Sequence, residues 1–136
     1  MIATICRKAH FNAAHRLHNP NWSEQKNEEV FGKCNNPYYH GHNFELEVRV
    51  KGEVNPDTGF IIDMADLGKI IKTEVEHRFD HKNLNLDCPE FEGVMPSTEN
   101  FAKIIYDILK EKIDAEHQLH ITLYETSKNS VEYGDW

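Results

Sequence analysis

Cysteine is scarce in this chain and forms no recognisable pair. Three cysteines occur in 136 residues, widely spaced and without a Cys-x-x-Cys motif; they are Cys6, Cys34 and Cys88. Their odd number and their spacing argue against a disulfide framework and against a cysteine-rich zinc site. At least one thiol is therefore expected to be free.

Long apolar runs and an excess of basic residues are also absent. No apolar stretch approaches the length of a membrane span and no cleavable signal opens the chain, which predicts a cytoplasmic protein without a membrane partner. The formal net charge is -8, so no basic stripe is available to neutralise the phosphates of a nucleic acid. The sequence has no Gly-x-Gly-x-x-Gly motif, so it gives no indication of a nicotinamide or flavin site. Histidine, by contrast, is abundant, with nine residues.

The spacing of apolar side chains predicts a single α+β domain over residues 1–136. Two strand patterns open the chain, two helical patterns follow, and two strand patterns close it. This order predicts a four-stranded antiparallel sheet with two helices on one face. The expected elements are strands at residues 2–11, 43–51, 119–124 and 130–133, helices at 63–80 and 97–113, and an irregular connection at 19–37.

The segment between Cys34 and His42 is dense in candidate chemistry, because it holds a thiol, a turn and two imidazoles. The strand that follows alternates apolar and charged residues. Extended backwards, the same alternation puts His40 and His42 on the apolar face. Only Gly41 lies between these histidines, so both imidazoles can bind one metal ion.

A catalytic zinc site typically has three protein ligands and one open position, so this pair needs a third ligand. His15 is our candidate, because an antiparallel arrangement brings the end of the first strand to the start of the second. His10 and His18 compete with it on sequence distance alone. The alternative is that His40 and His42 are ordinary surface or hydrogen-bonded histidines.

Other side chains could move protons. Cys34 lies in a polar loop, where a cation such as Lys33 would favour a thiolate that acts as a base or nucleophile. Asp80 and His81 can relay a proton if both face a site, although such a pair at a helix end more often makes a cap interaction. Glu125 falls on the apolar side of a strand, where a carboxylate must be paired or used.

Several short motifs, in a fixed order, cover nearly the whole chain. They are FNAAHRL at 11–17, FGKCNNP at 31–37, HGHN at 40–43, TG at 58–59, DHKNL at 80–84, STEN at 97–100 and ET at 125–126. Together they resemble the 6-pyruvoyltetrahydropterin synthase family, which includes the 6-carboxytetrahydropterin synthases of queuosine biosynthesis. Independent motifs in order are far more specific than any one alone.

This resemblance implies a role for each group of candidates. The implied zinc ligands are His15, His40 and His42. The implied proton-transfer groups are Cys34, as general base, with Asp80 and His81 as its partner relay. The implied pterin contacts are Thr98, Glu99 and Glu125, of which the last either anchors the ring or acts in the relay. From the sequence alone, Thr98 and Glu99 are simply residues at the start of a helix.

The resemblance also implies the substrate and the assembly. The substrate would be 7,8-dihydroneopterin triphosphate, which loses triphosphate, and zinc as a Lewis acid would make nearby C–H and O–H protons easier to remove. Family members have the tunnelling fold, in which trimers close a β-barrel and stack in pairs as homohexamers, with active sites between subunits. Cys34 of one subunit would then meet Asp80 and His81 of another.

An acidic chain must bind a triphosphate through local positive charge. Arg16 and Lys33 flank the proposed ligand and base in sequence, and we expect them to hold the phosphates. The five residues between Cys34 and His40 resemble the tetrahydrobiopterin-type enzymes, so 6-pyruvoyltetrahydropterin is the expected product and 6-carboxytetrahydropterin the alternative. More remote alternatives are a zinc hydrolase with an incidental Cys34 and a non-catalytic pterin-binding or metal-storage module.

Overall fold

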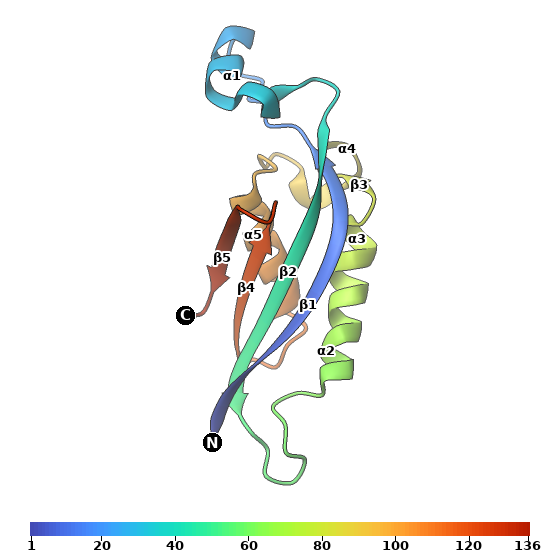
Figure 1. The fold of residues 1–136 in the computed structure, drawn as a ribbon, viewed down its shortest axis with the longest axis vertical. Coiled ribbons are helices and arrows are strands. Elements are labelled where there is room, and N and C mark those ends of the chain that lie inside the picture. The colour runs from blue at the N-terminus through green and yellow to red at the C-terminus, as the bar shows by residue number, and fades with distance from the viewer.

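A five-stranded sheet with helices on one face makes up the computed structural model, which describes residues 1–136 (Figure 1). The strands are β1 (Ile2–His15), β2 (His40–Glu53), β3 (Lys82–Asn83), β4 (Gln118–Tyr124) and β5 (Ser130–Gly134). The helices are α1 (Glu24–Phe31), α2 (Met64–Ile71), α3 (His77–Phe79), α4 (Leu84–Asp87) and α5 (Thr98–Lys110). The strand order is β3-β1-β2-β4-β5.

The α+β class is confirmed, but the sheet is mixed and has one more strand than predicted. β3 pairs in parallel with β1 through Ala13 and Ala14, whereas the other strand pairs are antiparallel. β3 has only the two residues Lys82–Asn83, both polar, which is too short for an alternating pattern to reveal it. The connection predicted to be irregular contains α1 and a 3-10 turn over Gly32–Asn35.

β1 and β2 form a long antiparallel pair that sets the geometry of the site. β1 continues four residues past its predicted end, so that His15 lies opposite His40 at one end of the pair. The predicted alternation along β2 is confirmed, because Phe44, Leu46, Val48 and Val50 are all buried in the core. His40 and His42 follow the same alternation and extend the core face toward the end of the sheet.

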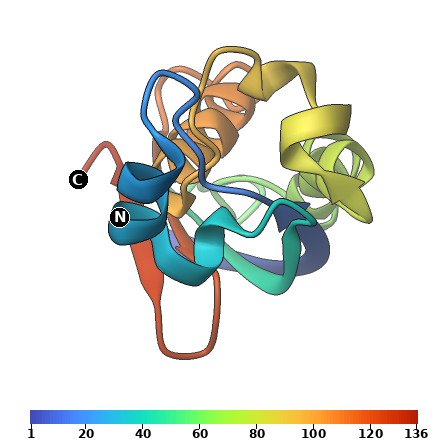
Figure 2. The same ribbon diagram turned by 90° about the horizontal axis from the view of Figure 1, so that it is seen from above.

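Two long helical segments cover the same face of the sheet (Figures 1 and 2). The first runs from α2 through a π turn at Lys72–Glu76 into α3, and Asp63 caps its start by accepting a hydrogen bond from the Ala65 N–H. Ser97 caps α5 in the same way, through the Asn100 N–H. Asp63 and Ser97 are the first residues of the two helical ranges that the sequence predicted, and both are residue types that favour this position. None of the helices has the length and apolar character that crossing a bilayer requires.

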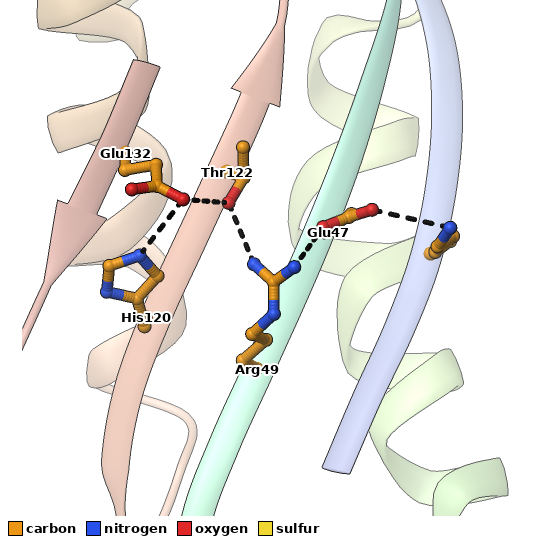
Figure 3. Close-up of polar contacts among 6 residues, drawn as sticks. Glu47, Arg49, His120, Thr122 and Glu132 are labelled. Carbon is orange, nitrogen blue, oxygen red and sulfur yellow. Dashed lines mark hydrogen bonds and ion pairs between the residues drawn. The ribbon is translucent and has the colours of Figure 1, made fainter. Parts of the chain in front are cut away.

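The opposite face of the sheet carries a row of paired polar side chains (Figure 3). Arg49 on β2 donates to Thr122 on β4 at 2.8 Å and also forms an ion pair with Glu47. Glu47 in turn lies 3.3 Å from Lys8 on β1, and Thr122 donates to Glu132 on β5 at 3.5 Å. Hydrogen bonds and ion pairs thus link polar side chains from four strands on this face.

The C-terminal segment is held to α5 and β4 through one carboxylate. Asp135 accepts hydrogen bonds from the Tyr106 hydroxyl, from Lys110 at 2.7 Å and from the Leu119 N–H at 2.7 Å. Partial burial alone would raise the pKa of Asp135, but these hydrogen bonds outweigh it and bring the pKa to about 2. The same contact raises the pKa of Tyr106 to about 12.

Replacing Asp135 with asparagine is expected to lower the free energy of unfolding by about 1–2 kcal/mol at neutral pH. The folded-state pKa of Asp135 lies below the ordinary aspartate value, so its contribution is present above about pH 4 and is lost as the pH falls toward 2. Urea denaturation of both proteins at pH 7 and at pH 3 measures the effect. Equal stability at pH 7 would contradict it, and the difference should shrink at pH 3.

Candidate metal centre and active site

Three histidines meet at the end of the β1–β2 pair. Their potential ligand nitrogens, one each from His15, His40 and His42, all lie within 4.8 Å of one another. The pairing of His15 with His40 and of Ala13 with His42 brings the three side chains to one face of the sheet. Of the two competitors for the third position, His10 lies opposite Glu45 and is exposed, and His18 bonds Asn35 instead.

The protonation of this cluster suits a metal ion. His15 Nδ1 donates to the Pro96 carbonyl at 2.7 Å, which leaves the lone pair on its Nε2. That Nε2, both ring nitrogens of His40 and the Nε2 of His42 are buried without a hydrogen-bond partner. Burial is the largest influence on the pKa of each histidine and lowers it, so the neutral, ligating form is favoured. Three neutral imidazoles with unpaired nitrogens fit zinc.

Glu125 lies next to the histidine cluster. The alternation of β4 puts this carboxylate on the apolar side of the strand, where it needs a partner or a function. Its Oε1 lies 3.4 Å from His42 Nε2, and its Oε2 accepts a hydrogen bond from the Thr98 hydroxyl. Glu125 follows the last residue of β4, and its N–H donates to the Asn129 carbonyl at 3.0 Å. The start of α5 and the end of β4 therefore hold this carboxylate from two sides.

Cys34 opens onto the same side of the cluster. A cavity of about 260 Å³ is lined by the half-buried Cys34 together with His15, Thr98, Glu99 and Glu125. These side chains come from β1, the 3-10 turn, α5 and the end of β4. A thiol, a carboxylate and one histidine of the cluster thus face one space that is large enough for part of a small ligand.

Asp80 and His81 lie on the other side of the cluster. The Asn12 N–H donates to Asp80 at 2.9 Å and lowers the pKa of that carboxyl, with a further contribution from His81, whose Nδ1 lies 3.0 Å from Asp80. His81 lines a second cavity, of about 550 Å³, together with His42. Within one chain, Cys34 and His81 therefore line different cavities.

The two basic residues expected at the phosphates differ in their surroundings. Arg16 is half-buried, and its Nε donates to the Asn35 carbonyl at 2.9 Å. Lys33 is exposed and makes no ion pair. Arg16 therefore already has a structural partner, while Lys33 is available to a ligand.

Some groups at the site were not found from the sequence. The Pro96 carbonyl orients His15, and a backbone acceptor has no residue signature. Asn129, Ser130 and Val131 line the cavity of Cys34 because the turn between β4 and β5 folds back beside it. Strands were predicted on both sides of this turn, at 119–124 and 130–133, but nothing in the sequence indicated that the turn faces a cavity.

The chain matches a family model and known proteins over nearly its full length. Residues 4–135 match the model of 6-pyruvoyl tetrahydropterin synthase. A 6-pyruvoyl tetrahydrobiopterin synthase from Poecilia reticulata is 44% identical over 97% of this chain and 90% of that protein, and the one from Homo sapiens is 40% identical over 96% and 90%. The structure of the Caenorhabditis elegans 6-pyruvoyl tetrahydropterin synthase superposes with a TM-score of 0.92 at 36% identity, over 100% of this chain and 97% of that one. The chain therefore belongs to the 6-pyruvoyl tetrahydropterin synthase family.

Proposed function

We propose that this chain is a zinc-dependent lyase that removes triphosphate from 7,8-dihydroneopterin triphosphate and forms 6-pyruvoyltetrahydropterin. The observation that carries the proposal is the cluster of three imidazoles with unpartnered ring nitrogens, beside a cavity lined by Cys34 and Glu125. The names of the relatives that are 40–44% identical support the product. A metal-storage role would have no use for the thiol and the carboxylate in that cavity.

Glu125 is the proposed anchor for the pterin ring. A pterin presents adjacent N–H donors on its pyrimidine edge, and a carboxylate accepts from such a pair in a directional way. The Thr98 hydroxyl holds Glu125 Oε2 and so restricts the orientation of the carboxylate. Glu99 is exposed at the rim of the same cavity, where it can contact the ring. The side chain of the bound substrate would then point toward the histidines.

Cys34 is the proposed general base. Its thiolate would take a proton from the substrate side chain, in the cavity that it shares with His15 and Glu125. Zinc held by His15, His40 and His42 would act as a Lewis acid that lowers the pKa of the substrate's C–H and O–H groups. Lys33, exposed next to Cys34, is a proposed contact for the triphosphate, together with the terminal guanidinium nitrogens of Arg16.

Asp80 and His81 are proposed to serve the active site of a neighbouring subunit. His81 lines a cavity that does not include Cys34, and Asp80 is paired with His81, so a joint role with Cys34 requires a second copy. The outer edge of β1 is paired only at Ala13 and Ala14, and β5 has no outer neighbour. Unpaired edges of this kind invite strand pairing between chains. We therefore propose trimers closed by sheet edges and stacked as a homohexamer.

Turnover of 7,8-dihydroneopterin triphosphate by the zinc-loaded protein tests the proposal. We expect stoichiometric release of triphosphate and a product with the mass of 6-pyruvoyltetrahydropterin, and loss of both when a chelator removes the metal. A product with the mass of 6-carboxytetrahydropterin would assign the chain to the alternative activity. Binding without release of triphosphate would contradict a catalytic role.

A further inference from the structure

The three residues after His15 bind the loop that carries Cys34. Arg16 Nε donates to the Asn35 carbonyl at 2.9 Å, and the Leu17 N–H donates to the Cys34 carbonyl at 2.8 Å. His18 Nδ1 donates to the Asn35 side-chain oxygen at 2.8 Å. These three consecutive hydrogen bonds join residues 16–18 to residues 34–35, and we call them the clasp.

The clasp is fixed on its other side by Asn85 in α4. The Arg16 N–H donates to Asn85 Oδ1 at 2.8 Å, and Asn85 Nδ2 donates to the Arg16 carbonyl at 2.9 Å. One side-chain amide thus satisfies both backbone groups of the residue that follows the metal ligand His15. Arg16 connects α4, the end of β1 and the Cys34 loop.

The rest of the loop between the two halves of the clasp is closed on itself. Asn27 is completely buried; its side chain accepts from the Asn19 N–H and donates to the carbonyls of Asn19 and Ser23. Figure 1 shows α1 beyond the end of β1 and β2, away from the helices that cover the sheet. Such a loop moves as a unit unless its base is held. The base is held by the clasp.

We propose that the clasp sets the position of the Cys34 thiol relative to the three histidines, with Arg16, His18 and Asn85 as positioning residues. The inference rests on the proposed role of Cys34 as base. Leu17 bonds the backbone of Cys34 itself and lies two residues from His15, so a displacement of the clasp displaces the thiol from the metal ligands. A misplacement of about 1 Å can cost on the order of 100-fold in rate.

Two variants of the assembled, zinc-loaded protein test this role. Arg16→Lys keeps the positive charge but loses the Nε–H, and His18→Ala loses the bond to Asn35. In each we expect kcat to fall by about 10- to 100-fold, and in His18→Ala KM should change by less than about threefold. His18→Asn, which keeps an amide close to the position of Nδ1, should restore most of kcat. Glu28→Gln, an exposed change on α1, is the matched control and should not alter kcat.

A second measurement tests the effect of the clasp on Cys34 and does not require turnover. Alkylation of Cys34 by iodoacetamide, followed by peptide mass, should be several-fold faster in Arg16→Lys and His18→Ala than in the unmodified protein. Unchanged alkylation rates, or a raised KM with unchanged kcat in Arg16→Lys, would overturn the proposal and make Arg16 a phosphate contact only. If the unmodified protein shows no turnover, the proposed function fails, whereas the alkylation rates still decide the role of the clasp.

Discussion

Replacement of Cys34 by alanine is expected to abolish triphosphate release almost completely while zinc stays bound. Cys34 lines the same cavity as Glu125 but does not belong to the three-histidine cluster, so its removal takes away the proposed base and leaves the three histidines in place. A general base typically contributes about 100- to 10,000-fold to the rate, and we expect a loss of kcat in that range. Triphosphate release and zinc content, measured on the same sample, check both parts.

Cys6→Ala is the matched control, because Cys6 is an exposed thiol on β1 opposite Arg49, far along the strand from His15. It should retain full activity. Cys88 is less suitable, since it is buried in the core and burial raises its pKa to about 11. If Cys34→Ala kept most of its activity, the thiol would be incidental and hydrolysis by metal-activated water would become the better explanation.

Replacement of His40 by alanine is expected to remove both zinc and turnover. The three imidazoles are the only protein nitrogens that converge in this cluster, and two ligands hold zinc poorly. Removing a residue that hydrogen-bonds to a metal ligand lowers metal affinity by about 10- to 100-fold. Removing a ligand itself should therefore lower zinc affinity by at least about 100-fold. Competition with a chromophoric chelator measures the zinc affinity, and the triphosphate assay measures turnover.

His10→Ala separates this loss from a general effect of removing histidine. His10 competed with His15 on sequence distance, but it is exposed and lies opposite Glu45. Its replacement should leave zinc affinity unchanged. Zinc bound equally tightly by His40→Ala and by the unmodified protein would rule out the three-histidine centre. His40 was chosen over His15 because His15 is buried and bonded to Pro96, so its removal also disturbs the fold.

Most of the regular structure could be predicted, because it depends on local periodicity and local capping. The alternation of Phe44, Leu46, Val48 and Val50 predicted a half-buried strand, and all four side chains are buried. Asp63 and Ser97, the first residues of the two predicted helical ranges, cap α2 and α5. The two-residue strand β3 was missed, because it has no local pattern. For the same reason the predicted range of β1 left out its last four residues. Tertiary pairing alone stabilises them.

The sequence determined by itself which residue types are available and which face of each element they occupy. Periodicity put His40, His42 and Glu125 on the core side, and the ordered motifs indicated the family that the comparisons establish. Such statements follow from the geometry of a single strand or helix, in which side-chain direction repeats with a fixed period.

Only the tertiary structure decided which of these groups meet. The β1–β2 register selects His15 over His10, and the Pro96 carbonyl assigns the proton of His15. The fold also places Cys34 and His81 in different cavities, and it bonds the Arg16 Nε to the loop that carries Cys34. These relations join residues about 20 to 80 positions apart through single hydrogen bonds and strand pairs, and a local pattern carries no information about them.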